Sequence, residues 1–268
     1  MSQQKRPVLG LIVLLLYLFL LAPIFIIVLA AFNAGEYLTF PPQGLSFRWF
    51  IKFAESGPFV RAFYFSLKLA AYTTVFSIIL GTGAALFVVR YAPAKVKDAL
   101  RLLLIAPLQL PSILTGIALL IFYYRIGLST RGMTGLLIGH VLVCIPYVFM
   151  NVTSVLIGFD RSLEEAAHSL GAGPFTVFRR VTLPLIKGGV ISGAVFSFIT
   201  SFDQFPISLM LVSVGNTTLP IQLFDYLRFS FDPTAAAVST ISVVMTMILV
   251  LVTERLVGLE SLYWGGKK

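Results

Sequence analysis

Six long apolar stretches constrain the fold of this 268-residue sequence more than any other feature. They cover residues 8–32, 67–89, 102–124, 134–157, 189–212 and 235–257. Each is long enough to cross the hydrocarbon core of a bilayer, which takes about 20 apolar residues in a helix. Charged residues make up 12% of the sequence, whereas ordinary soluble domains hold about 25%. The sequence therefore predicts an all-α, polytopic membrane protein with six transmembrane helices over residues 8–257, between short tails at 1–7 and 258–268.

The first stretch follows Lys5 and Arg6, as the core of a secretory signal peptide would. A cleaved signal usually has an apolar core of about 7 to 15 residues, and this stretch is longer. We therefore expect a retained transmembrane helix.

The distribution of the 20 Lys and Arg residues predicts the orientation in the membrane. Thirteen fall in or beside the two tails and the second and fourth connections, against seven in or beside the other connections. Because cytoplasmic loops are enriched in Lys and Arg, both termini and the connection 158–188 are expected in the cytoplasm. The net charge of +9 is spread over short loops, so nucleic acid is not expected as a partner.

The connection 158–188 contains a short amphipathic segment with its own start and stop signals. Ser162 and Glu165 have the spacing of a capping box, and Gly171 can adopt the left-handed conformation that ends a helix. One face of this predicted helix is narrow and apolar, and consists of Leu163, Ala166, Ala167 and Leu170. So short a helix is marginal alone, which indicates that it folds against a partner.

A second short helix is expected over residues 175–181, because Pro174 suits a helix N-terminus. Arg179 and Arg180 near its end could meet lipid phosphate or an acidic partner surface. The pair Leu183-Pro184 is then expected to turn the chain into the fifth apolar stretch.

Polar residues and prolines interrupt three of the stretches. Pro107 and Pro111 flank Gln109 in the third, which predicts a kink. Asp203 is expected well inside the fifth, where it would either face a water-filled pathway or make a structural hydrogen bond to a neighbouring helix; both interpretations stay open. His140 in the fourth is expected to bond to a neighbouring group and not to take part in chemistry.

The sequence lacks the motifs of an enzyme. A phosphate-binding G-x-x-x-x-G-K-[ST] loop is absent, so any ATP hydrolysis must come from another chain. The two histidines are far apart and Cys144 is the single cysteine, so neither a metal site, a cofactor nor a disulfide is expected. Two alternatives to an ATP-driven transporter are a secondary carrier or channel and a non-conducting membrane scaffold. A carrier would usually show repeated halves and several buried charges.

The motif of the fourth connection resembles that of a known family. Glu165-Ala166-Ala167, Gly171, Val181 and Leu183-Pro184 are similar to the E-A-A-x3-G-x9-I-x-L-P signature of binding-protein-dependent ABC importer permeases. Val181 replaces the common isoleucine, and the spacings are those of the signature. The resemblance implies the type I ABC importer permease fold, with residues 67–257 as its five-helix core and residues 8–32 as an additional helix.

The resemblance also implies partners and site residues. A cytoplasmic ABC ATPase dimer would supply the energy, an extracytoplasmic solute-binding protein would deliver the solute, and a second permease subunit, expected to be a homologous but different chain, would complete the pathway in the bacterial inner membrane. The short helix would be the coupling helix that sits in a groove of the ATPase. The implied coupling residues are Leu163, Glu164, Glu165, Ala166, Ala167, Leu170, Gly171, Val181, Leu183 and Pro184.

Weaker motifs point to the solute. Residues 38–50, Ser201-Phe202-Asp203 and residues 216–220 are similar to those of spermidine/putrescine permeases, although Gln204 stands where those proteins often carry a second acid. The candidate solute pathway is Asp203, Gln204 and Gln109. Other small solutes, such as 2-aminoethylphosphonate or ferric iron, are the alternatives.

Overall fold

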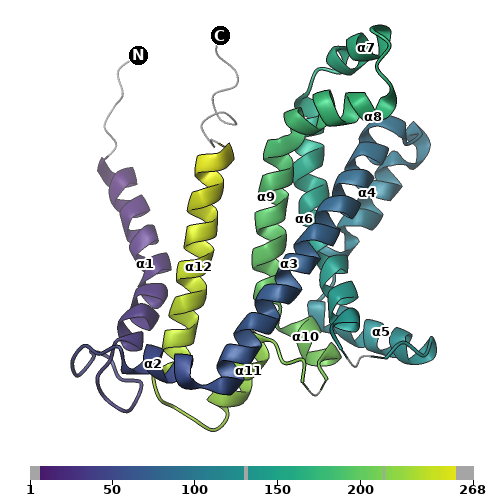
Figure 1. Ribbon diagram of the computed structural model, residues 1–268. Helices are drawn as coiled ribbons and strands as arrows, with labels where there is room; N and C mark the ends of the chain where they lie inside the picture. The colour runs from purple at the N-terminus through teal and green to yellow at the C-terminus, as the bar shows by residue number, and fades with distance from the viewer. Residues whose placement is uncertain (1–6, 130–131, 214, 258–268) are drawn as a thin grey trace. The chain divides into compact units, whose positions relative to one another are not determined.

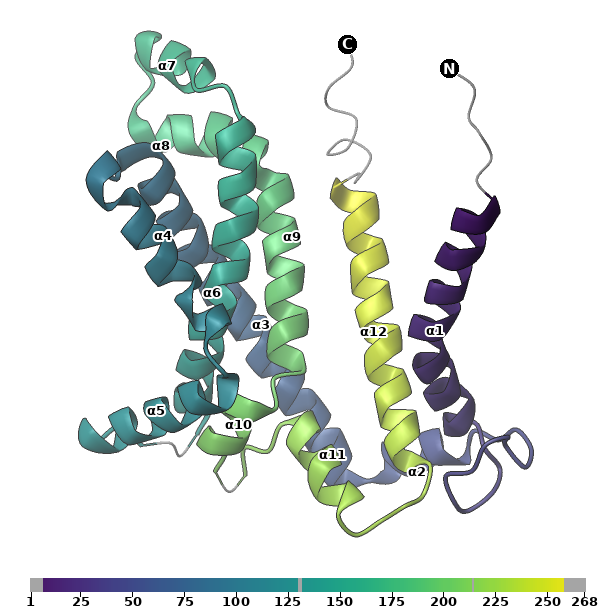
Figure 2. The same cartoon turned by 180° about the vertical axis from the view of Figure 1, so that it is seen from behind.

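The computed structural model describes residues 7–129, 132–213 and 215–257, and this part of the chain is helical apart from loops and one isolated bridge between Asn33 and Leu45. Figures 1 and 2 show the helices from opposite sides. The elements, in chain order, are α1 (Pro7–Ala31), α2 (Arg48–Glu55), α3 (Gly57–Leu86), the π-helical η1 (Phe87–Tyr91), α4 (Ala94–Gln109), α5 (Ser112–Arg125), α6 (Met133–Gly158), α7 (Ser162–Ser169), α8 (Pro174–Val177), the π-helical η2 (Phe178–Thr182), α9 (Leu183–Phe202), α10 (Pro206–Leu211), α11 (Leu219–Leu227) and α12 (Thr234–Val257).

Five helical runs of the described residues are long and apolar enough to cross a membrane: Leu9–Ala31, Gly57–Tyr91, Met133–Gly158, Pro174–Phe202 and Thr234–Arg255. The pair α4 and α5 makes a sixth if it counts as one broken span. The all-α, polytopic architecture predicted from the sequence is therefore confirmed.

Two of the apolar stretches are broken where a single helix was expected. In the third, α4 ends at Gln109 and α5 starts at Ser112, with an angle of 103° between them. Pro111 explains the break, because a proline disfavours helical conformation in the residue before it, and Leu110 is extended (ψ 140°). The predicted kink is thus a sharp bend.

The fifth stretch is also divided, and this corrects the position of Asp203. Helix α9 ends at Phe202, Asp203 is its C-cap residue, and α10 begins at Pro206. Pro206 has no N–H to offer to the carbonyl of Phe202, so the helix does not continue. Asp203 therefore lies at the end of a helix and not in the middle of one.

The described residues form two compact units, residues 7–60 with 223–245 and residues 61–222 with 246–257. In the first, Trp49 of α2 is buried against Ala30 and Ala31 of α1 and Ala236 and Ala237 of α12. The indole Nε1 of Trp49 donates to the carbonyl oxygen of Asn33 at 2.7 Å. Small side chains on α1 and α12 thus make room for one large aromatic ring.

The second unit is built around α6 and α9, which lie side by side in both ribbon views (Figures 1 and 2). Gly193 of α9 faces Val148 of α6 so closely that a Cβ on the glycine would lie 2.7 Å from the Val148 Cα. Small residues let two helix backbones approach closely, and such close packing holds helices together in a membrane, where the hydrophobic driving force between helices is missing.

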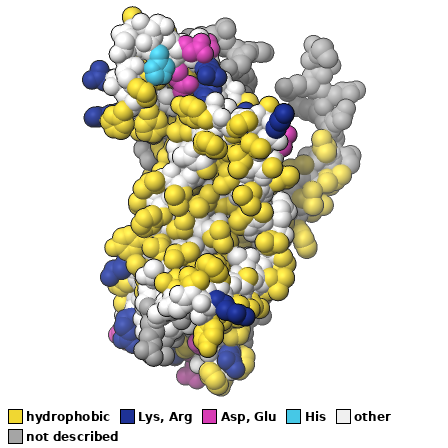
Figure 3. All heavy atoms as spheres, turned by 90° about the vertical axis from the view of Figure 1, so that its right-hand side faces the viewer, with side chains coloured by type: hydrophobic (Ala, Val, Ile, Leu, Met, Phe, Trp, Pro, Cys, Tyr) yellow, Lys and Arg dark blue, Asp and Glu magenta, His cyan; other side chains and the backbone are white. Residues whose placement is uncertain are grey.

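Figure 3 shows one face on which hydrophobic side chains cover the middle, while Lys, Arg, Asp and Glu gather toward its two ends. This distribution is typical of a surface whose middle meets lipid and whose ends meet water.

Candidate functional site

The short helix predicted in the fourth connection is α7, and it ends as the sequence predicts. Gly171 has a φ of +84°. Its N–H donates to the His168 carbonyl at 2.9 Å, and the N–H of Ala172 donates to the Ala167 carbonyl at 3.1 Å. These two bonds form a Schellman motif, which fixes the length of the helix.

The start of α7 differs from the prediction, because no capping box forms between Ser162 and Glu165. Ser162 is the first helical residue, and its N–H donates to Oδ1 of Asp160 at 2.9 Å. This bond lowers the pKa of the Asp160 carboxyl below its ordinary value. Glu165 instead pairs with Arg161, with 3.3 Å between Oε1 and Nε. A carboxylate competes better than a hydroxyl for the positive end of a helix, which explains why Asp160 takes the role.

The apolar face of α7 is uncovered. Leu163 is 48% exposed and Leu170 is 88% exposed, and Ala166 between them is exposed as well. Ala167 is partly buried. Two leucines held in water by a helix of defined length are a surface to which a partner can bind.

Glu164 differs from the other coupling candidates because it points into the unit. Its Oε2 lies 3.1 Å from Nε of Arg90 in η1, and its Oε1 accepts a 2.7 Å hydrogen bond from the Thr182 hydroxyl in η2. The side chains of Glu164 and Arg90 are 15% and 12% exposed. The guanidinium of Arg90 also lies over the ring of Phe159, 5.1 Å from its centroid. The sequence offered no signal for this pairing, because the partners are far apart along the chain.

A cavity of about 160 Å³ adjoins this contact. Residues from the end of α3, from η1, from α7 with its N-cap residue, and from the α8–η2 segment line it: Leu86, Arg90, Tyr91, Arg161, Glu164, Glu165, His168, Pro174, Val177, Phe178 and Thr182.

The remaining coupling candidates lie where the chain returns into the unit. Val181 is a half-buried residue of η2, and Leu183 and Pro184 are exposed at the start of α9. The expected change of direction at Leu183-Pro184 is a bend within a helix (Figure 1), because the backbone stays helical from Pro174 to Phe202. The π-helical turn of η2 lies just before Pro184, and such a turn accommodates the proline and the bend seen between α8 and α9 in Figure 1.

The candidate pathway residues lie at helix ends. Asp203 and Gln204 follow α9 directly, and Gln109 is the last residue of α4; Asp203 and Gln109 are exposed and Gln204 is partly buried. His140 helps to fix this end of α9. It is buried, and its ring nitrogens lie 2.9 Å from the hydroxyls of Ser201 and Ser208. His140 thus connects two serines, one on each side of the break at Asp203, to α6. The sequence predicted that His140 bonds to a neighbouring group but did not identify these serines.

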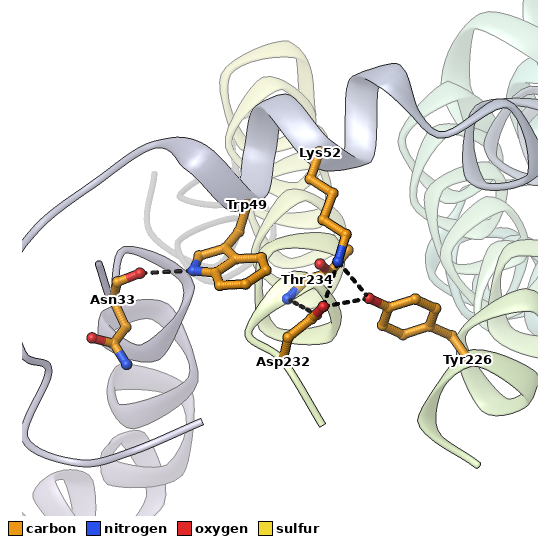
Figure 4. Close-up of polar contacts among 6 residues, drawn as sticks. All are labelled: Asn33, Trp49, Lys52, Tyr226, Asp232 and Thr234. Carbon is orange, nitrogen blue, oxygen red and sulfur yellow. Dashed lines mark hydrogen bonds and ion pairs between the residues drawn. The ribbon is translucent and has the colours of Figure 1, made fainter. Parts of the chain in front are cut away.

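In the first unit, a polar cluster joins α2, α11 and α12 (Figure 4). Lys52 forms an ion pair with Asp232, the hydroxyl of Tyr226 donates to Asp232 at 2.7 Å, and the N–H of Thr234 donates to it at 3.0 Å. Burial opposes ionisation of Asp232, but the hydrogen bonds from Lys52, Thr234 and Tyr226 outweigh it and hold its pKa below the ordinary value. The hydrogen bond to Asp232 raises the pKa of Lys52.

These opposite shifts predict a pH window for the cluster. The contribution of Asp232 is present above its unfolded pKa of about 4 and is lost as the pH falls through the lower folded value; that of Lys52 is present below about 10 and is lost as the pH rises through the higher folded value. Because Lys52 is half-exposed, we expect Asp232→Asn to lower the melting temperature by only about 2 °C at pH 7.

Thermal unfolding of the purified protein in detergent measures this effect, and the difference from the parent should shrink below about pH 4. Asp225→Asn removes an exposed carboxylate from α11 and is the matched control. An equal loss at pH 7 and at acidic pH would contradict the ionic role of Asp232.

The long apolar helices define a polytopic membrane protein, and α7 is a short helix with an exposed apolar face. The chain belongs to the family of binding-protein-dependent transport system inner membrane components, whose profile matches residues 74–259. It is 35% identical over 235 residues to the putrescine transport system permease protein PotI of Escherichia coli, covering 86% of this chain and 83% of the relative. It is 31% identical over 239 residues to the spermidine/putrescine transport system permease protein PotC of Haemophilus influenzae, covering 89% and 91%.

Solved structures share the fold. A bacterial ABC transporter that imports alginate matches with a TM-score of 0.71 at 16% identity, over 95% of this chain and 98% of that chain. The MetNI methionine ABC transporter matches with a TM-score of 0.61 at 21% identity, over 74% and 94%. The chain is therefore a permease subunit of an ABC importer, a transport component and not an enzyme, as the sequence predicts.

Proposed function

We propose that this chain forms half of the solute pathway of an importer for polyamines, putrescine or spermidine, and that α7 couples the pathway to a cytoplasmic ATPase. The observation that carries the coupling role is the exposed apolar face of α7, held on a helix that a Schellman motif stops and Glu164 anchors. The solute class is supported by the relatives PotI and PotC, whose names state putrescine and spermidine/putrescine transport.

The proposed assembly has four kinds of chain. A dimer of ABC ATPases sits on the cytoplasmic side, an extracytoplasmic binding protein delivers the solute, and a second, homologous permease completes the pathway. Both termini of this chain lie in the cytoplasm, as does α7. The excess of Lys and Arg on that side supports this orientation.

The transport cycle follows from a difference in ATP affinity between two states of the ATPase pair. ATP binds better to the ATPase pair in its closed state, so it shifts the population toward that state. Closure moves the two coupling helices as rigid bodies, and the pathway changes from inward-facing to outward-facing. Hydrolysis and release of the products reverse the shift.

Co-expression of the tagged chain with its neighbouring transport genes, followed by purification and uptake of labelled putrescine into proteoliposomes, tests the proposal. We expect an ATPase subunit in the complex and uptake that requires internal ATP and the binding protein. Uptake without ATP would support a secondary carrier instead. An ATP-dependent complex that transports 2-aminoethylphosphonate or ferric iron but no polyamine would replace the solute and keep the importer.

Asp203 gives a second prediction within this function. Asp203→Asn removes a negative charge from the exposed end of α9 and keeps the shape of the side chain. If the carboxylate contacts a cationic solute, uptake should fall about tenfold or more, because hydrogen bonds to charged groups contribute about 1.5–3 kcal/mol. Binding of the ATPase should stay the same.

The control for this prediction is Gln204→Glu, which adds a carboxylate beside Asp203 and should not reduce polyamine uptake. Equal loss of uptake and of ATPase binding in Asp203→Asn would assign a structural role to Asp203.

A further inference from the structure

One carboxylate on the coupling helix holds the two π-helical segments of the second unit. Glu164 of α7 contacts Arg90 in η1 through Oε2 and Thr182 in η2 through Oε1. Segment η1 is the end of the helical run Gly57–Tyr91, and η2 lies near the start of the run Pro174–Phe202. The two longest helical runs therefore converge on one side chain of α7.

The other polar side chains of α7 bond within their own loop. Glu165 pairs with Arg161, the ring of His168 lies 3.1 Å from the Ala172 carbonyl, and the hydroxyl of Ser169 donates to the Glu165 carbonyl. Glu164 and Glu165 are thus neighbours with different surroundings. Glu164 is mostly buried between structural elements, whereas the side chain of Glu165 is 67% exposed beside the apolar face.

The backbone at both contacts is π-helical. π-Helical turns, with i→i+5 hydrogen bonds, are rare and are frequently found at functional sites. Glu164 is linked to both such turns, so a displacement of α7 acts on α3 and on α9 together. A buried ion pair can transmit such a displacement, because separating its charges is costly and the two residues therefore move together.

We propose that Glu164 is the positioning residue that carries the displacement of α7 into α3 and α9, and that it does not contact the ATPase. The contact with Arg90 moves α3, and the contact with Thr182 moves α9. Phe159, which lies against the guanidinium of Arg90, excludes water from one side of the ion pair. This inference rests on the proposed coupling role of α7 and assigns the transmission to one side chain.

The test uses the complete complex in proteoliposomes and three readouts: ATPase bound per permease, ATP hydrolysed, and putrescine taken up per ATP hydrolysed. The variants are Glu164→Gln, Arg90→Gln, their combination, and Thr182→Val. Asp98→Asn is the matched control, because it also neutralises the acidic partner of an ion pair in this unit, but on a side chain that is 89% exposed. A purely structural loss would lower the amount of complex and leave uptake per ATP unchanged.

We expect Glu164→Gln and Arg90→Gln to keep the ATPase bound within about twofold and to lower uptake per ATP at least about fivefold, the lower end of typical coupling between sites. The combined variant should lose no more than the worse single variant, since the two residues act as one unit. Thr182→Val should cause a smaller loss in the same direction, and Asp98→Asn should keep uptake per ATP.

Several results would overturn the inference while the proposed function stands. Uptake per ATP could be unchanged in Glu164→Gln, the losses of Glu164→Gln and Arg90→Gln could multiply in the combined variant, or Glu164→Gln could release the ATPase, which would make Glu164 a contact residue. If the parent complex binds no ATPase, the proposed function fails first and the inference fails with it.

Discussion

Replacing Leu170 by aspartate is expected to remove the ATPase from the purified complex while the permease stays folded. Leu170 is 88% exposed, so its side chain contributes little to the stability of this chain. At an interface, the same position would place a charge against an apolar groove. Loss of a central apolar contact often costs about 2 kcal/mol or more, so we expect binding to weaken about 30-fold or more. Co-purification and titration with the isolated ATPase measure the effect.

Ser169→Asp is the matched control, because it places the same charge on the same turn of α7 but on the polar face. Both variants carry the same small penalty from a negative charge at a helix C-terminus. If Ser169→Asp weakened ATPase binding as much as Leu170→Asp, the apolar face of α7 would not be the binding surface.

Gly193→Leu is expected to destabilise the second unit strongly. A Cβ at this position would lie 2.7 Å from the Val148 Cα, and backbone atoms cannot move aside as a side chain can. Overpacking a core usually costs about 1–3 kcal/mol. The collision with a backbone atom should bring the loss in free energy of unfolding to about 3 kcal/mol, with little protein recovered from the membrane.

Thermal unfolding of the purified chain in detergent checks this prediction, with Gly83→Ala as the control. Gly83 lies in α3, and a Cβ there would have nothing within 4 Å, so the control should be neutral or slightly stabilising. A normal yield and melting temperature for Gly193→Leu would show that α6 and α9 do not approach each other at this glycine.

The sequence predicted those features that depend on local chemistry. Long apolar stretches gave the class of fold, and Gly171 gave the end of α7 because a left-handed residue at that point needs a glycine. Pro111 indicated a break in the third stretch, although its size, an angle of 103°, depends on how α5 packs on α10. Pro206 indicated the end of α9 just as clearly. The prediction that placed Asp203 inside one unbroken helix did not take this proline into account.

Features that depend on contacts between distant segments could not be predicted. Arg90 and Glu164 are basic and acidic residues in loops that the sequence places on the same side of the membrane, but many other pairs satisfy that condition. At the start of α7, the Asp160 carboxylate and the Ser162 hydroxyl were both possible acceptors for the free N–H groups of the first turn. The carboxylate is the stronger acceptor, and it takes the bond. The serine partners of His140 likewise lie on helices whose packing a single sequence does not reveal.

The ATPase activity of the assembled complex tests the central claim most directly. It would be measured in proteoliposomes with and without the binding protein, and with and without putrescine or spermidine. Stimulation that requires the binding protein and the polyamine together is the result we predict, because a solute-loaded binding protein favours the state in which the ATPases close. A complex without an ATPase, or one whose ATP hydrolysis ignores both the binding protein and every solute offered, would contradict the account.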